Sequence, residues 1–254
     1  MIHVAVDAYF VYFLMVLTAL AVSLYGFRLA TRGRAQSDRV SKIGGTALVG
    51  QGVMEMTYWA IEPFVKSLVW LGITPNGLTW SALVLGLGAG VALAFGWFGL
   101  AAMLATFSTI GDILDGQVAR MTNTGSDKGE LLDAAVDRYT EFAFIAGLVI
   151  FMRDSVWQMS LAMAALLASF MVSYASAKAE ALQVEAPRGL MRRHERSTYL
   201  ISGARFSATF GVWFSSGHPD VPWYALELIA LGIVALIGNY SAVVRFVRIG
   251  RALR

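Results

Sequence analysis

The chain has 254 residues, of which 57% are hydrophobic, and its mean hydropathy of +0.62 indicates a polytopic membrane protein rather than a soluble domain. The net charge of +3 comes from basic residues that gather at membrane edges rather than along one surface, so it does not indicate nucleic-acid binding. The absence of cysteine excludes disulfides, thiolate metal sites and a cysteine nucleophile.

An apolar run at residues 4–26 is long enough to span a bilayer as a helix. The first ten residues of the chain carry no Lys or Arg, so the run lacks the basic start of a signal peptide. Five cations follow it: Arg28, Arg32, Arg34, Arg39 and Lys42. Because such a basic segment resists translocation, we expect a true membrane span whose N-terminus lies outside the cytoplasm.

Residues 51–71 form the next candidate helix. A helical arrangement places Glu55, Glu62 and Lys66 on one face and apolar residues on the rest, which suits a helix lying in the cytoplasmic interface of the membrane. Pro63 is expected to break or kink this helix at the preceding residue. The same pattern fits an ordinary core helix equally well.

Six more apolar segments complete an all-α bundle. Thr74-Pro75-Asn76 marks a turn and the next span starts at Gly77; the others cover about 100–121, 129–152, 156–182, 197–214 and 223–245. With the N-terminal run, the sequence predicts seven spans. Gly86, Gly88 and Gly90 lie in the middle of a span, where close helix packing explains them better than a phosphate-binding loop.

Charged and aromatic residues predict the orientation of these spans. Alternation puts the 28–50 loop, the 121–129 turn, the 183–196 loop and the C-terminal tail in the cytoplasm. The basic residues on that side include Arg188, Arg192, Arg193 and Arg196 in one loop and Arg245, Arg248, Arg251 and Arg254 in the tail. The outer loops hold only Arg153, and an aromatic belt of Trp97, Trp157, Trp213 and Trp223 falls at outer helix ends.

A polar motif, D-x2-D-G-x2-A-R-x8-G-x3-D-x3-D, interrupts this apolar chain between Asp112 and Asp137. Its first half is spaced by threes and fours, which puts those residues on one face of a helix, and its second half does the same on another helix. The polar residues 121–128 contain Gly125 and predict a turn, so the two helices run antiparallel. We expect the carboxylates to meet as two level pairs, Asp115 with Asp133 and Asp112 with Asp137.

Four facing carboxylates in a membrane require cations beside them. Oxygen ligands without cysteine or a nearby histidine favour a hard divalent ion, Mg²⁺ or Mn²⁺, and four carboxylates have enough oxygens for two ions. One alternative is a solvated charge cluster paired to the nearby Arg120, Lys128 and Arg138. Another is a membrane cation transporter, although these pairs lie near one membrane surface rather than at the midplane.

The motif matches the signature of the CDP-alcohol phosphotransferase family at every position, and the chain resembles that family over roughly residues 55–250. The resemblance implies a six-helix core, usually homodimeric, that transfers a phosphatidyl or related group from a CDP-linked lipid to an alcohol and releases CMP. It implies that metal binds to Asp112, Asp115, Asp133 and Asp137, that Asp137 is also the general base, and that the nucleotide is held by Asp112, Gly116, Arg120 and Gly129.

A second motif follows in the span before the 183–196 loop and in that loop. Y-x3-K-A-E from Tyr174 and G-x3-R-x-E-R from Gly189 are similar to the pattern in family members that use inositol phosphate as the acceptor. An acceptor phosphate needs cations of its own, and the resemblance implies Lys178, Arg193 and Arg196. Ordinary enrichment of basic residues in an inner loop explains the arginines as well, and glycerol phosphate would need the same charges.

These inferences predict how the chain divides into domains and where in the cell the protein lies. Residues 1–50 form an extra transmembrane helix and a basic cytoplasmic loop, and residues 51–254 form the membrane domain with its interfacial helix. The expected partners are a CDP-linked lipid donor, a small polar alcohol, membrane lipids and a second copy of the chain, without nucleic acid. We expect an integral protein of a prokaryotic cytoplasmic membrane whose site faces the cytoplasm.

Overall fold

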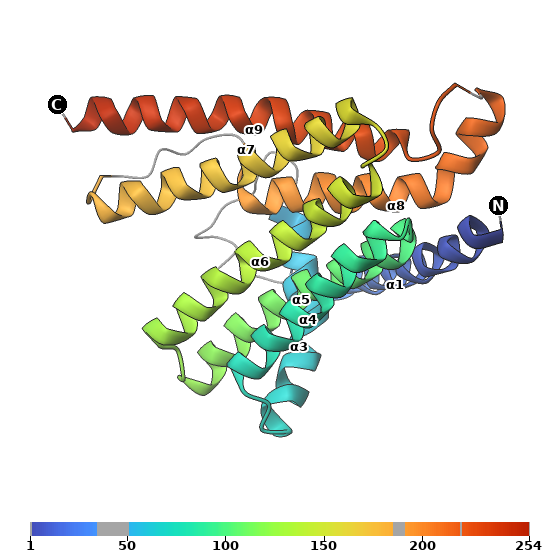
Figure 1. Ribbon diagram of the computed structural model, residues 1–254. Helices are drawn as coiled ribbons and strands as arrows, with labels where there is room; N and C mark the ends of the chain where they lie inside the picture. Colours follow the sequence, from blue (N-terminus) through green and yellow to red (C-terminus); the bar gives the residue numbers. More distant parts are fainter. Residues whose placement is uncertain (1, 35–50, 185–190, 219, 254) are drawn as a thin grey trace.

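The computed structural model describes residues 2–34, 51–184, 191–218 and 220–253, and every regular element among them is a helix. The helices are α1 (Ile2–Arg32), α3 (Gln51–Trp70), α4 (Pro75–Ala94), α5 (Phe98–Thr122), α6 (Asp127–Phe151), α7 (Val156–Ala181), α8 (Arg193–Gly217) and α9 (Ala225–Ala252). This confirms the all-α bundle (Figure 1). Arg39, Lys42, Arg188 and Arg254 lie outside the described residues.

Each predicted span coincides with a helix, and five of these helices, α1, α4, α5, α7 and α9, are long and apolar enough to cross a membrane. The other two, α6 and α8, have 25 residues each, about 37 Å of helix, which is also enough to cross. They are less apolar because their charged residues, among them Asp133 and Asp137 on α6 and Arg193 and Arg196 on α8, serve the polar centre described below.

Helix α4 lies against both helices that carry the aspartate motif. It packs closely on α5 and on α6. A β-carbon at Gly90 would overlap the Ala143 carbonyl of α6, one at Gly147 would overlap the Gly90 carbonyl, and one at Gly86 would overlap the Thr140 side chain. The close-packing interpretation is therefore correct for Gly86 and Gly90, and α4, α5 and α6 form one tight block.

A second block consists of α7 and α9, with α8 packed on α9 and on α5. Small residues line α7 where it is buried, including Ala165, Ala168 and Ala175, and a β-carbon at Gly238 of α9 would press on Ala168. The two blocks are joined by the turn between α6 and α7 and by the packing of α8 on α5. From that turn the two helices diverge, as Figure 1 shows. The polar centre lies between the blocks.

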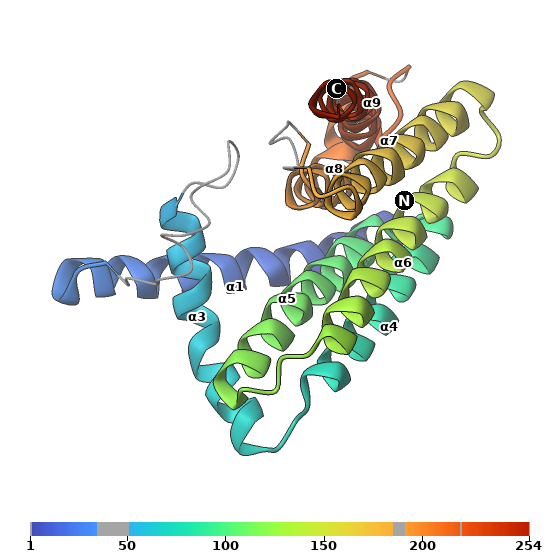
Figure 2. The same cartoon turned by 90° about the vertical axis from the view of Figure 1, so that its left-hand side faces the viewer.

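The N-terminal helix α1 is attached to the start of α5 by a buried carboxylate. Asp7 is 1% exposed and accepts hydrogen bonds from the backbone N–H groups of Gly99 (2.6 Å) and Leu100 (2.9 Å) at the start of α5. At the other end of α1, Tyr25 packs on Trp59 of α3 with ring centroids 5.5 Å apart. Figure 2 shows α1 extending away from the bundle to cross α3.

The structure corrects one expectation for α3 and decides another. Pro63 lies inside a continuous helix, so the expected break is wrong, whereas the expected kink stays a prediction. The missing N–H removes only one bond of the helix, and both neighbouring turns remain paired. Ile61 and Val65 are buried, whereas Phe64 is 66% exposed, so α3 is an amphipathic surface helix rather than a core helix. Glu55 does not share the exposure of Glu62 and Lys66, because it is buried.

The three connections α4–α5, α6–α7 and α8–α9 lie at one end of the molecule, together with the N-terminus (Figure 1). Aromatic rings fill this end: Phe98 packs against Trp223 with centroids 4.9 Å apart, and Phe151 packs against Tyr224 at 5.0 Å. The four predicted belt tryptophans stand at helix ends here. The aspartate motif points to the opposite end, as the alternation of helices requires.

Candidate active site

The turn between the two motif helices forms as the sequence predicts. Helix α5 ends at Thr122, and Asn123 adopts the left-handed conformation with φ 53° that commonly closes a helix. Ser126 then caps α6, its Oγ accepting from the Gly129 N–H at 3.2 Å. The short connection returns α6 antiparallel to α5, so the aspartates of both helices face one another.

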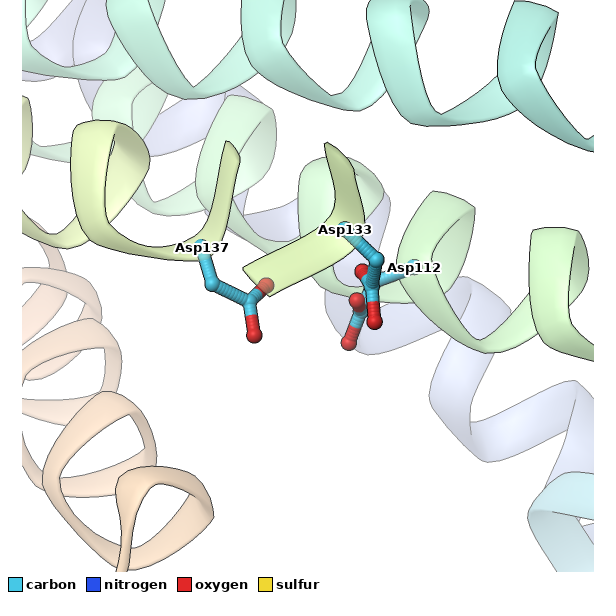
Figure 3. Close-up of side chains that lie close together, drawn as sticks. All are labelled: Asp112, Asp133 and Asp137. Carbon is cyan, nitrogen blue, oxygen red and sulfur yellow. The ribbon is translucent and has the colours of Figure 1, made fainter. Parts of the chain in front are cut away.

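Three of the four aspartates form one cluster. Asp112 from α5 and Asp133 and Asp137 from α6 each offer a carboxylate oxygen within 4.8 Å of the others. Figure 3 shows the three carboxylates pointing into the same space. The Asp133 Oδ1 atom is buried without a hydrogen-bond partner, so an oxygen-liganded cation suits it. This donor set fits a hard divalent ion.

Asp112 and Asp137, which were expected to form one pair, both belong to this cluster, whereas Asp115 does not. Its Oδ2 accepts a hydrogen bond of 2.6 Å from Thr79 Oγ1 of α4, and both side chains are buried. Spacing along each helix fixes which residues share a face, but the rotation of one helix against the other is set by packing on α4. Asp115 still lines the same cavity as the other three aspartates. Its role as a metal ligand stays a prediction.

The cation that the carboxylates face comes from a distant part of the chain. Arg193, the first residue of α8, forms an ion pair with Asp137 and lies 3.5 Å from Asp112 Oδ2. Of the cations that lie close to the motif in sequence, Arg138 forms its ion pair with Glu141. The acidic cluster and the second sequence motif are therefore one site.

Two hollows meet at this site. The first, of about 50 Å³, is lined by the four aspartates and by Thr79, and continues between the apolar Ala89, Ala105 and Phe144. The second is a cleft of about 660 Å³ between α6, α7, α8 and α9. Five arginines line the cleft: Arg138, Arg192, Arg193, Arg196 and Arg245. Asp137 and Arg193 line both hollows, so an acidic chamber opens directly beside a basic one.

The three cations expected to bind the acceptor occupy different positions. Arg193 lies at the junction of the two hollows. Arg196 is fully buried and its guanidinium is held by Glu141 at 2.7 Å and by the Met191 carbonyl at 2.8 Å. Lys178 is exposed and is not among the residues that line the cleft. The structure thus brings Arg193 and Arg196 together and leaves Lys178 outside.

Arg245 is a site residue that the sequence did not reveal. It is 6% exposed, lines the basic cleft and donates to Ser176 Oγ at 2.7 Å. Its buried Nε has no hydrogen-bond partner, and no carboxylate of the described chain lies within ion-pairing distance of it. In the sequence it is one of several arginines of a basic tail, and nothing distinguishes it from exposed neighbours such as Arg251.

The comparisons with known proteins agree with this geometry. The sequence profile described as CDP-alcohol phosphatidyltransferase matches residues 72–202, which include the whole aspartate motif and Arg193. The chain belongs to this family.

Named relatives and solved structures lie within the family. The chain is 31% identical over 204 residues to the phosphatidylinositol phosphate synthase of Cutibacterium acnes, covering 76% of this chain and 95% of that protein. It is 35% identical over 162 residues to the phosphatidylinositol phosphate synthase of Mycobacteroides abscessus, covering 59% and 70%. The crystal structure of the Mycobacterium tuberculosis phosphatidylinositol phosphate synthase in complex with manganese and citrate superposes with a TM-score of 0.64 and 25% identity, covering 74% and 87%.

Of the residues that the family resemblance assigns to the nucleotide, Asp112 belongs to the carboxylate cluster, and the other three lie nearer the turn that joins α5 to α6. The Arg120 side chain folds back along α5, so that a β-carbon at Gly116 would lie 3.2 Å from its guanidinium. Gly129 stands in the first turn of α6, where Ser126 caps it. Asn76 of α4 lies across from Gly129, 3.6 Å from where its β-carbon would be. Gly116 therefore lies beside the Arg120 guanidinium, and Gly129 lies beside Ser126 and Asn76.

Proposed function

We propose that this protein transfers a phosphatidyl group from a CDP-linked lipid to the hydroxyl of inositol phosphate and releases CMP. The observation that carries the proposal is the junction of an acidic and a basic hollow at Asp137 and Arg193. A pyrophosphate with its cations suits the acidic hollow, and a phosphorylated alcohol suits the arginine cleft. The names of the relatives support the same reaction.

The donor is assigned to the motif helices. Asp112, Asp133 and Asp137 would hold the divalent cation, with Asp115 as a further ligand. Bound there, Mg²⁺ or Mn²⁺ supplies charge neutralisation at the pyrophosphate. Gly116, Arg120 and Gly129 are assigned to the nucleotide, because glycine lets phosphate and ribose approach the backbone and the guanidinium can pair with phosphate oxygens.

The acceptor is assigned to the arginine cleft. A phosphate monoester brings about two negative charges and needs charge-assisted donors. Arg193 and Arg245 are the arginines best placed for it, since Arg193 reaches the reaction site and the Arg245 Nε lacks a partner. Arg192 lines the same cleft. Lys178, expected from the resemblance, is a weaker candidate because the cleft does not include it.

Asp137 is assigned as the general base. It is the only aspartate of the motif that lines both hollows, so its carboxylate can reach an acceptor hydroxyl while belonging to the metal cluster. It is 8% exposed, which keeps bulk water away from the proton transfer. In-line attack of the hydroxyl on the donor phosphorus would then come from the side opposite the bond to the CMP leaving group, which breaks as the new bond forms, at the border between the hollows.

We further propose that the protein is a homodimer in the cytoplasmic membrane of a prokaryote and that its site faces the cytoplasm. Residues 51–254 form the membrane domain, and residues 1–50 are an addition to it. The cysteine-free chain allows a direct test. A single cysteine at Asp154, which is exposed, should react with an impermeant reagent in intact cells, and one at Thr124 only after permeabilisation. The reverse labelling would overturn the orientation. Native mass spectrometry in detergent tests the dimer.

The acceptor is tested with purified protein and CDP-diacylglycerol. Inositol phosphate, glycerol phosphate, serine and free inositol are offered separately and in competition, and CMP release and the lipid product are measured. We expect inositol phosphate to give the highest kcat/KM. Preference for glycerol phosphate would overturn inositol phosphate as the acceptor but keep a phosphorylated alcohol in the arginine cleft. Preference for free inositol or serine would overturn the role of the arginine cleft.

A further inference from the structure

Next to the reaction site, Glu141 and Arg196 form a second acid–arginine pair. Arg196 Nε lies 2.7 Å from Glu141 Oε1, and Nη2 lies 3.2 Å from Oε2, so the ion pair is bidentate. The side chains are 1% and 7% exposed. Two-point pairing of this kind fixes orientation as well as distance.

The remaining polar atoms of this pair are also engaged. Arg196 Nη1 donates to the Met191 carbonyl at 2.8 Å, and Nη2 also approaches Ser173 Oγ of α7 at 3.3 Å. Arg138 donates to Glu141 Oε2 at 2.8 Å and to the same Ser173 hydroxyl. Each of the three guanidinium nitrogens of Arg196 therefore has a protein acceptor, and these four contacts leave only one N–H group, on Nη1, for an acceptor phosphate.

The two pairs are consecutive along their helices. Asp137 and Glu141 are four residues apart on α6, and Arg193 and Arg196 are three residues apart on α8. One helical turn thus separates the reactive pair, Asp137–Arg193, from the buried pair, Glu141–Arg196. The backbones of α6 and α8 make few close approaches, so these long side chains bridge the two helices.

We propose that Glu141 and Arg196 are positioning residues. Their pair sets the register of α8 against α6 and thereby holds Arg193 beside Asp137, whereas Arg196 itself does not bind the acceptor. This inference rests on the proposed function, and it revises one acceptor residue within it. The contacts of Arg196 with Ser173 and with the Met191 carbonyl also connect this pair to α7 and to the residues just before α8.

A double-mutant cycle separates positioning from direct binding. The variants Glu141→Gln, Arg196→Gln and their combination are assayed for the KM of acceptor and donor. If Arg196 acts only through Glu141, each single variant raises the acceptor KM about tenfold or more, and Arg196→Gln adds little in the Glu141→Gln background. If Arg196→Gln raises the acceptor KM by the same factor in both backgrounds, Arg196 is a ligand and the inference is wrong.

A charge-conserving variant guards against loss of folding and against changes in net charge. Glu141→Asp keeps the carboxylate but withdraws it by one methylene group, so the fork no longer fits. Positioning predicts a raised acceptor KM with an unchanged donor KM. An unchanged or lowered acceptor KM would overturn the inference. The matched control is Glu62→Gln, which breaks an exposed acid–base pair on α3 and should alter neither KM.

The register is also measured without turnover. Spin labels on cysteines at Tyr139 of α6 and Thr198 of α8, both exposed, report the distance between the helices. We expect Glu141→Asp and Arg196→Gln to broaden or shift the distance distribution in the same way, and Glu62→Gln to leave it unchanged. An unaltered distribution would refute positioning even if the acceptor is assigned correctly. Lack of product with inositol phosphate in the wild-type protein would instead overturn the acceptor and this inference with it.

Discussion

Replacing Arg245 by glutamine tests whether the basic cleft binds the acceptor, because Arg245 makes few contacts that would stabilise the fold. Its guanidinium has one hydrogen bond, to Ser176, a buried Nε without a partner, and no carboxylate of the described chain within ion-pairing distance. Loss of one charge-assisted contact to the acceptor phosphate costs about 1.5–3 kcal/mol, so the acceptor KM should rise roughly 10- to 150-fold. The donor KM should stay within about twofold.

The thermal stability of Arg245→Gln should be maintained or increased, although its affinity for the acceptor falls. Burying an unpaired charge and an unsatisfied N–H is unfavourable by about 1–3 kcal/mol, and glutamine removes both. We therefore expect Arg245→Gln to unfold at an equal or higher temperature in detergent while its acceptor kinetics worsen. Arg251→Gln is the matched control, since it removes the same charge from an exposed position on the same helix. Equal KM values for Arg245→Gln and the control would refute the assignment.

Three further predictions concern other parts of the site and fold. Asp137→Asn should lower kcat about 10²- to 10⁴-fold and leave CDP binding largely intact; near wild-type turnover would contradict its role as the base. Dialysis with excess chelator should abolish CMP release, and Mn²⁺ or Mg²⁺ should restore it; full activity without a divalent ion would exclude the proposed metal site. Asp7→Ala removes the cap of α5 and should destabilise the protein by about 1–2 kcal/mol in chemical unfolding, whereas unchanged stability would show that α1 is held by apolar contacts alone.

The sequence predicted the local parts of the site well. Helical faces, the turn at 121–129 and the family all follow from residues close together in the chain, and Asn123 and Ser126 close the two motif helices as turn chemistry requires. The spacing of the aspartates also placed them correctly on facing helices. These features depend on the period of the helix and on short-range capping, which the order of residues determines directly.

Contacts between helices that are far apart in the sequence could not be predicted from helix periodicity and capping. The spacing could not show that Asp115 turns to Thr79, because the rotation of α5 is set by its packing on α4. Nor could it show that Arg193 pairs with Asp137, since 56 residues separate them. The pairing of Arg196 depends on Glu141, which belongs to neither of the two sequence motifs. Such pairings require the three-dimensional arrangement of α6, α7 and α8.

The division into two blocks has a consequence for how such proteins diversify. The carboxylates and the nucleotide residues lie on α5 and α6. Backbone contact at Gly90 and Gly147 holds α6 to α4, and α5 is held to α4 by a hydrogen bond from Ser108 to the Ala82 carbonyl. All but one of the cleft arginines, by contrast, belong to the other block or to the segment that enters it. Substitutions in α7, α8 and α9 can therefore alter the alcohol that is recognised while the bond-breaking machinery stays intact, so that new headgroups can evolve on an unchanged reaction.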